Sequence, residues 1–186
     1  MTLKERIEGY VPFNEQEKED RRLMLKYIGE HDDILLRVNE TFHFTASAWV
    51  TDRSHTKILM LYHNIYNSWS WPGGHADGEE DLPAVALREV REETGIEHLR
   101  LVDENPLSLE ILTVNAHFKK GKYVAPHLHL NLTYLIEADD ADRLKVKPDE
   151  NSAQKWFDMD AAVAASTESD MRVVYSKLNQ KMRELY

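Results

Sequence analysis

Three glutamates near the middle of the chain have the residue type and spacing to do chemistry. Glu89, Glu92 and Glu93 stand at positions i, i+3 and i+4, so on a helix of about 3.6 residues per turn they share one face. Like charges held this close raise one another's pKa values, and the arrangement makes sense mainly when a divalent cation lies among them. Carboxylate oxygens favour a hard ion, so the trio predicts a site for Mg²⁺ or Mn²⁺.

The residues around the trio predict the helix that must position it. Asp81 suits the N-cap, Pro83 suits the first turn, and Gly95 suits the position just past the last turn. We therefore expect a helix from Leu82 to Thr94. The face opposite the trio carries Leu87, Val90 and Thr94.

A solvated acidic helix is the alternative explanation for three neighbouring glutamates. It does not explain the glycine pair Gly73-Gly74 upstream, Glu80 six positions after Gly74, or the terminating Gly95. Gly74 to Ile96, with Arg88-Glu89-Val90 followed by Glu92-Glu93, matches every fixed position of the Nudix box. The chain therefore resembles the Nudix hydrolase family.

The resemblance implies an α/β fold, namely an α/β/α sandwich with a mixed β-sheet. It also implies a hydrolase acting on phosphorus-containing anhydrides, which cleaves a nucleoside diphosphate linked to another moiety by water attack on phosphorus. The implied cofactor is Mg²⁺ or Mn²⁺, and the implied partner is a small nucleotide or diphosphate substrate.

The resemblance also assigns roles by position. Glu89, Glu92 and Glu93 match the metal ligands, and Glu89 matches the residue that positions or deprotonates water. The Gly73 carbonyl matches a further ligand, and Arg88 matches an arginine that orients the acids. Glu80 matches an acid that supports a helix.

Many relatives add one carboxylate ligand from outside the box, and no motif fixes its position. Glu150 is our first candidate for this ligand, and Glu110 or Glu137 is the second. A simple exposed acid is the more common role for any one of the chain's 33 acidic residues.

Alternating patterns predict the strands of the sheet. Residues 42–50 alternate like a half-buried strand, and Lys57 to His63 form its hairpin partner. Two further strands are expected at 107–118 and 127–136, separated by a polar turn at 119–122.

Several side chains beside these elements are candidates for substrate binding. Trp69 and Trp71 either stack on a nucleobase or anchor their loop to the core, and the sequence leaves both interpretations open. His127 and His129 face the same side of their strand, which is compatible with a metal. A substrate-contacting or sheet-face pair is the favoured interpretation, because the sequence identifies no third ligand. The candidates for substrate contact are Trp69, Trp71, Gly74, His75, His127 and His129.

The two ends of the chain predict additional helices. Residues 1–12 are expected to form a loosely held arm, and Asn14 begins a capping box for an amphipathic helix over about 15–30. A short helix at about 158–165 precedes a final helix capped by Ser169 or Asp170. We expect one Nudix domain over residues 1–186, with an N-terminal helical extension at about 1–32.

Composition narrows the possible partners and location. A net charge of −10 disfavours binding to nucleic acid, and no apolar run approaches the length of about 20 residues needed to span a membrane. The absence of cysteine excludes disulfides and thiolate metal sites. The first residues lack the apolar stretch of a signal peptide, so we expect a cytoplasmic protein. A homodimer is a possible state.

Three other functions compete with hydrolysis. A non-catalytic nucleotide-sensing Nudix module would have the same fold, but such modules usually carry an eroded box and a basic DNA-binding domain. Isopentenyl diphosphate isomerase, a Nudix relative, uses a cysteine that this chain lacks. A helical-bundle partner with an acidic face is at odds with the strand patterns. The sequence does not identify the substrate.

Overall fold

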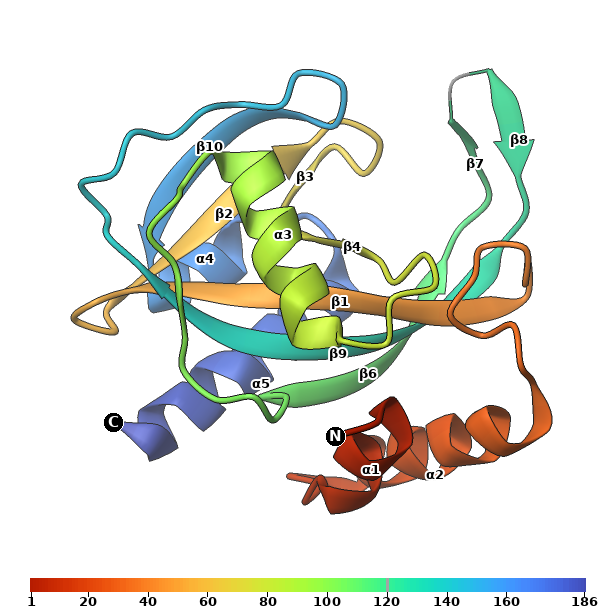
Figure 1. Ribbon diagram of the computed structural model, residues 1–186. Helices are drawn as coiled ribbons and strands as arrows, with labels where there is room; N and C mark the ends of the chain where they lie inside the picture. The colour runs from red at the N-terminus through yellow and green to blue at the C-terminus, as the bar shows by residue number, and fades with distance from the viewer. Residues whose placement is uncertain (120) are drawn as a thin grey trace.

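The protein is described by a computed structural model covering residues 1–119 and 121–186. It contains a mixed eight-stranded sheet with helices on both faces (Figure 1), which confirms the predicted α/β sandwich. The main strand order is β10 (Asn151–Asp158), β2 (Lys57–His63), β1 (Phe42–Asp52), β9 (His127–Ala138) and β5 (Arg100–Leu101). Three strands extend this path: β3 (Ser68–Ser70) on β2, β4 (Gly73–His75) on β1, and β6 (Ser108–Val114) on β9.

The two longest strands form the centre of the sheet. β1 and β9 run parallel, in a register that pairs Phe42 with Leu128 and Asp52 with Ala138. β2 returns antiparallel beside β1, as the predicted hairpin requires. The pairing of β1 with β9 therefore brings residues that are far apart in the sequence onto the same face of the sheet.

The glutamate helix α3 (Leu82–Thr94) covers the first face of the sheet, over the predicted range. Asp81 occupies the N-cap position, although its side chain makes no capping hydrogen bond. Gly95 ends the helix with a φ of 74°, a left-handed conformation that favours glycine. The helix buries Leu82, Val85, Ala86 and Val90 against the sheet.

Two helices near the C-terminus cover the opposite face. α4 (Met159–Ala165) and α5 (Ser169–Leu185) enclose a second core around Trp49, whose ring stacks on Tyr175 at 5.1 Å between centroids. Glu168 is the N-cap of α5 and forms no side-chain capping bond, so the predicted cap at Ser169 or Asp170 is wrong.

β1 is buried along its whole length, so the prediction of a half-buried strand is wrong. Its period of two is nevertheless real, because Phe44, Ala46 and Ala48 belong to the first core. On the other face the Thr45 and Ser47 hydroxyls each donate to the side-chain oxygen of Asn131 in β9, at 2.9 Å. A satisfied polar stripe therefore replaces the expected solvent face.

The N-terminal residues are ordered, and the prediction of a loose arm is wrong. Residues 3–9 form helix α1 (Leu3–Gly9), which begins with a complete capping box between Thr2 and Glu5. Leu3 and Ile7 are buried in the first core, and the Leu3 N–H donates to Glu80 Oε1 at 3.1 Å. Glu80 therefore accepts a hydrogen bond from the first turn of α1.

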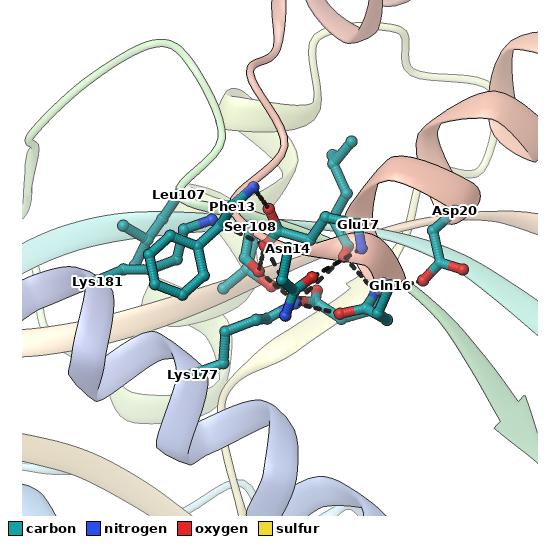
Figure 2. Close-up of polar contacts among 12 residues, drawn as sticks. Phe13, Asn14, Gln16, Glu17, Asp20, Leu107, Ser108, Lys177 and Lys181 are labelled. Atoms are coloured by element: carbon teal, nitrogen blue, oxygen red, sulfur yellow. Dashed lines mark hydrogen bonds and ion pairs between the residues drawn. The ribbon is translucent and has the colours of Figure 1, made fainter.

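A buried charge cluster fastens the N-terminal helices to the sheet and to α5. Glu17 of α2 (Glu15–Glu30) is fully buried, and it accepts hydrogen bonds from Tyr10 at 2.6 Å and Ser108 at 2.7 Å. Lys177 and Lys181 of α5 pair with the same carboxylate at 3.1 and 2.8 Å (Figure 2). One carboxylate therefore joins elements from both ends of the chain.

The remaining predictions for strands and loops are partly correct. The segment 107–118 contains β6 and the start of a separate strand, β7 (His117–Lys119), which pairs with β8 (Lys122–Val124). The hairpin β7–β8 extends away from the sheet (Figure 1). The turn predicted at 119–122 includes Lys120, which lies outside the described residues. In the described ranges, no helix has both the length and the apolar character needed to cross a membrane.

Candidate functional site

The glycine pair lets strand β4 lie directly against the glutamate helix. The Gly73 N–H donates to Glu93 Oε2 at 2.9 Å. A Cβ on Gly74 would lie 2.5 Å from the Glu89 carboxyl carbon, and one on Gly73 would lie 2.7 Å from the Ala46 carbonyl oxygen. Position 73 therefore needs glycine because its nearest neighbours include backbone atoms, whereas a side chain at position 74 would displace the Glu89 carboxylate. The glycine pair is therefore in direct contact with two of the three box glutamates.

The three box glutamates lie in different environments. The Glu92 side chain is about half exposed, whereas Glu93 is buried. Burial raises the pKa of Glu93 to about 8, and the nearby Glu89 charge adds to this increase. The hydrogen bond from the Gly73 N–H acts in the opposite direction and lowers the pKa. Burial and the Glu92 charge likewise raise the pKa of Glu89. The positive charges near Glu89 and Glu93 are therefore too few to offset the cost of burying these two carboxylates.

Two cations approach this cluster, and the sequence predicted one of them. Arg88 Nε lies 4.0 Å from Glu92 Oε1, as the i,i+4 spacing predicts, and Arg88 Nη2 lies 3.5 Å from Glu89 Oε1. Lys147 was not predicted, although its Nζ lies 3.8 Å from Glu92 Oε2 and 2.7 Å from Glu150 Oε2. Although burial opposes it, the hydrogen bond to Glu150 raises the pKa of Lys147.

Of the three carboxylates considered outside the box, Glu150 lies with the cluster. Its charge contributes to the raised pKa values of Glu89 and Glu93. Glu110 is buried beside Lys177, 3.0 Å from its Nζ, and Glu137 pairs with Arg100 and His55. Those two acids are therefore engaged elsewhere.

The donor chemistry of the cluster suits a hard divalent cation. Its side-chain ligands are all carboxylate oxygens, and burial and mutual repulsion raise the pKa values of two of them. Among the described residues, the box glutamates are not a trio with ligand oxygens within 4.8 Å of one another. Mg²⁺ is usually held by one or two carboxylates together with waters, so a Mg²⁺ site does not require such a trio.

The two tryptophans pack against the second core. The Trp69 ring meets Phe157 edge to face at 4.9 Å, and the Trp71 ring meets Tyr175 in the same way at 5.3 Å. The Trp71 N–H of the backbone donates to the Tyr175 hydroxyl at 3.4 Å. This packing supports loop anchoring over base stacking.

Histidines gather at one end of the polar stripe. His75 lies on β4 and His129 on β9, with ring centroids 5.0 Å apart, and both rings approach His43 of β1. Burial lowers the pKa of His75 to about 3 and that of His129 to about 2, with neighbouring histidines adding to both shifts. Burial also lowers the pKa of His43. These rings are uncharged at neutral pH.

A family model described as the NUDIX domain matches residues 41–178, well over half of the chain. The chain belongs to the Nudix family. This finding confirms the family expected from the box, and with it a hydrolase of phosphorus-containing anhydrides at the level of the family.

Named Nudix relatives align with about two thirds of the chain. An RNA pyrophosphohydrolase of Pelagibacter ubique (strain HTCC1062) is 28% identical over 66% of this chain and 78% of its own length. The asymmetrical bis(5'-nucleosyl)-tetraphosphatase of Rattus norvegicus is 33% identical over the same shares. A solved binary complex of a C. elegans Ap4A hydrolase has the same fold, with a TM-score of 0.56 and 22% identity, over 76% of this chain and 98% of its own.

Proposed function

We propose that this Nudix protein is a divalent-metal-dependent pyrophosphohydrolase that cleaves a nucleoside diphosphate linked to another moiety, by water attack on phosphorus. The observation that supports this most directly is the close packing of Glu89 and Glu93 on the Gly73-Gly74 strand, with Glu92 and Glu150 beside them. A solvated acidic face would not bury Glu93 and leave the Glu89 side chain only 15% exposed.

The residues that would hold the ion come from two elements and one loop. Glu89, Glu92 and Glu93 of α3 would serve with the Gly73 carbonyl and Glu150. Bound Mg²⁺ would neutralise charge on the diphosphate and lower the pKa of a water. Glu89, held against Gly74, would position that water and accept its proton, because its raised pKa makes it a better base.

Two basic side chains would share the negative charge of the site. Arg88 lies near both Glu89 and Glu92, so it would orient these acids. Lys147 lies between Glu92 and Glu150 and would leave them for a substrate phosphate when the ion binds. These are electrostatic roles, and the proposed reaction forms no covalent intermediate with the protein.

The names of the relatives suggest a substrate class. One is an RNA pyrophosphohydrolase and another is a bis(5'-nucleosyl)-tetraphosphatase, so each is named for an anhydride attached to a nucleotide. We propose a small nucleotide carrying a polyphosphate chain, with a nucleic-acid partner disfavoured by the net charge of −10. A cytoplasmic location and a homodimer remain predictions.

The test is a substrate panel with a matched pair of variants. The protein is incubated with a dinucleoside tetraphosphate, nucleoside triphosphates, a nucleotide sugar and 5'-triphosphorylated RNA, with Mg²⁺ or with EDTA, and products are separated by chromatography. We expect Mg²⁺-dependent cleavage of at least one compound. Glu92→Gln should lower kcat by about 100-fold or more, because Glu92 is a proposed ligand whose removal costs little stability. Glu97→Gln, an exposed acid just past the helix, is the control.

The sensing alternative gives a different result in the same experiment. A non-catalytic Nudix module would bind a nucleotide without cleaving it, and Glu92→Gln would then change no rate. Cleavage that persists in EDTA, or equal turnover by Glu92→Gln and Glu97→Gln, would contradict the proposed mechanism.

A further inference from the structure

Four histidines from three strands meet at one end of the polar stripe, and the charge of Asp77 acts on His43 and His75. The ring centroid of His43 lies 5.1 Å from that of His75, 5.0 Å from that of His127 and 5.1 Å from that of His129. One ring nitrogen from each of His43, His75 and His129 lies within 4.8 Å of the other two. In the described parts of the chain, this is the only group of three such ligand atoms that meets this distance.

His43 has a buried ring nitrogen that is free to accept a ligand. Its Nδ1 lies 2.9 Å from the Asn39 carbonyl oxygen, which can only accept, so Nδ1 carries the proton. In an uncharged ring Nε2 is then an unprotonated acceptor. His43 is 4% exposed, and its Nε2 has no hydrogen-bond partner among residues 1–119 and 121–186. A buried polar atom of this kind calls for a ligand.

His127 has the same arrangement on the other side of the cluster. Its Nδ1 lies 2.9 Å from the Ala125 carbonyl oxygen, so Nδ1 carries a proton, and in the uncharged tautomer Nε2 is an acceptor. Nε2 lies 3.2 Å from Nε2 of His129. This distance suits a hydrogen bond between two histidines, and it also suits two ligands on one tetrahedral zinc, which lie about 3.3 Å apart when each Zn–N bond is about 2.0–2.1 Å.

The Nδ1 atoms of His43 and His127 help to distinguish a hydrogen bond between two histidines from a shared metal ion. Histidines that bind metals almost always donate the other ring N–H to a carboxylate, a backbone carbonyl or a water. His43 and His127 both donate to backbone carbonyls. A hydrogen bond between His127 and His129 would leave Nε2 of His43 without a partner, whereas a shared cation would satisfy all of these nitrogens.

The chemistry of the cluster selects the class of ligand. Uncharged imidazoles provide lone pairs and no positive charge, so they suit a cation better than a phosphate. Nitrogen ligands favour borderline transition metals such as Zn²⁺ over Mg²⁺, which prefers oxygen. The carboxylate cluster on α3 and the histidine cluster therefore differ in the metal that they favour.

We propose that the protein binds one zinc-class transition-metal ion through His43, His75 and His129, with His127 as the fourth ligand. The ion would join β1, β4 and β9. This proposal stands apart from the proposed hydrolase function, because it depends on nitrogen ligands outside the Nudix box, and a catalytically inactive protein would still bind the ion.

The first test is direct metal binding by the untagged protein. After chelator treatment and dialysis, it is titrated with Zn²⁺ against a chromophoric chelator, and bound metal is counted by mass spectrometry. We expect one tightly bound equivalent of Zn²⁺, unaffected by a large excess of Mg²⁺. Substitution with Co²⁺ should give the intense visible absorption of a four-coordinate site. A protein that retains no Zn²⁺ would overturn the proposal.

Variants then identify the ligands. His129→Gln and His75→Gln should each weaken Zn²⁺ binding by about 100-fold or more, because even partners outside the ligand set are worth about 10- to 100-fold. His98→Gln is the matched control, since His98 is exposed in the loop after α3 and is not part of the cluster. Circular dichroism checks that each variant is folded, and His75 is the safer position because its ring is less buried than that of His43.

One further variant separates this proposal from the hydrolase proposal. Glu92→Gln should lose turnover and keep its Zn²⁺ equivalent and its Co²⁺ spectrum. If Glu92→Gln loses the Zn²⁺ while His75→Gln and His129→Gln keep it, the ion belongs to the carboxylates and the histidine site is refuted.

Discussion

The buried Glu17 carboxylate offers a quantitative test of the fold. Burial alone would raise its pKa, but hydrogen bonds from Lys181 and Tyr10, together with the Lys177 charge, lower it from 4.5 to about 2. At about 1.4 kcal/mol per pKa unit, this shift corresponds to about 3 kcal/mol of folding free energy. A typical domain has a total stability of about 5–15 kcal/mol, so one carboxylate carries a large share.

The sign of the pKa shift fixes the pH dependence. Because the folded pKa lies below the unfolded pKa, the contribution is present above pH 4.5 and is lost as the pH falls toward 2. About 1 kcal/mol of it is gone by pH 3.5. Acid should therefore narrow the stability difference between the wild-type protein and a variant that lacks this charge.

Glu17→Gln removes the charge and leaves Lys181 without its carboxylate partner. Because breaking a buried pair costs about 3–5 kcal/mol, we expect the free energy of unfolding at pH 7 to fall by about 3 kcal/mol. Urea unfolding at pH 7, 5 and 3.5 measures both this loss and its decrease in acid. Glu19→Gln, an exposed acid on the same helix, should change stability by less than about 0.5 kcal/mol.

Two results would refute this reasoning. A loss below about 1 kcal/mol at pH 7 would mean that Glu17 is not paired as described. A difference from wild type that stays constant from pH 7 to pH 3.5 would mean that its folded pKa is not lowered.

Two further predictions concern the Nudix site. Gly74→Ala should lower turnover about tenfold or more with little change in Tm, because its Cβ would displace the flexible end of Glu89. Gly29→Ala is the control, because a Cβ there would meet nothing within 4 Å. Equal turnover by the two variants would contradict the argument from close packing. Lys147→Met should lower the Mg²⁺ concentration for half-maximal activity a few-fold, because the Lys147 Nζ lies 3.8 Å from Glu92 and competes with Mg²⁺ for that carboxylate. Rate assays in which the variant needs more Mg²⁺ than the wild-type protein would contradict this.

Local signals allowed the sequence to predict the glutamate helix and the approximate positions of the main strands. Pro83 and Gly95 mark the two ends of α3, and the strand period of two reflects side chains alternating between faces. The same kind of signal was missed at the N-terminus, where Thr2 and Glu5 form a capping box.

Contacts between distant segments were beyond the reach of local patterns. His43, His75 and His129 meet only because β4 and β9 both pair with β1, and no local spacing encodes this topology. Lys147 is one lysine in a charged loop until the fold places it beside Glu92. The burial of Thr45 likewise depends on Asn131, a partner on another strand.

The parallel pairing of β1 with β9 has a consequence for folding order. About two fifths of the chain, residues 53–126, is made after β1 and before its partner, so the apolar side of α3 has no complete sheet to cover while synthesis proceeds. Pairing of such distant segments is intrinsically slow and leaves intermediates open to aggregation. A nascent chain that stops short of residue 127 would therefore carry every residue of the Nudix box and remain unfolded, and misfolding in the cell would concentrate in this interval.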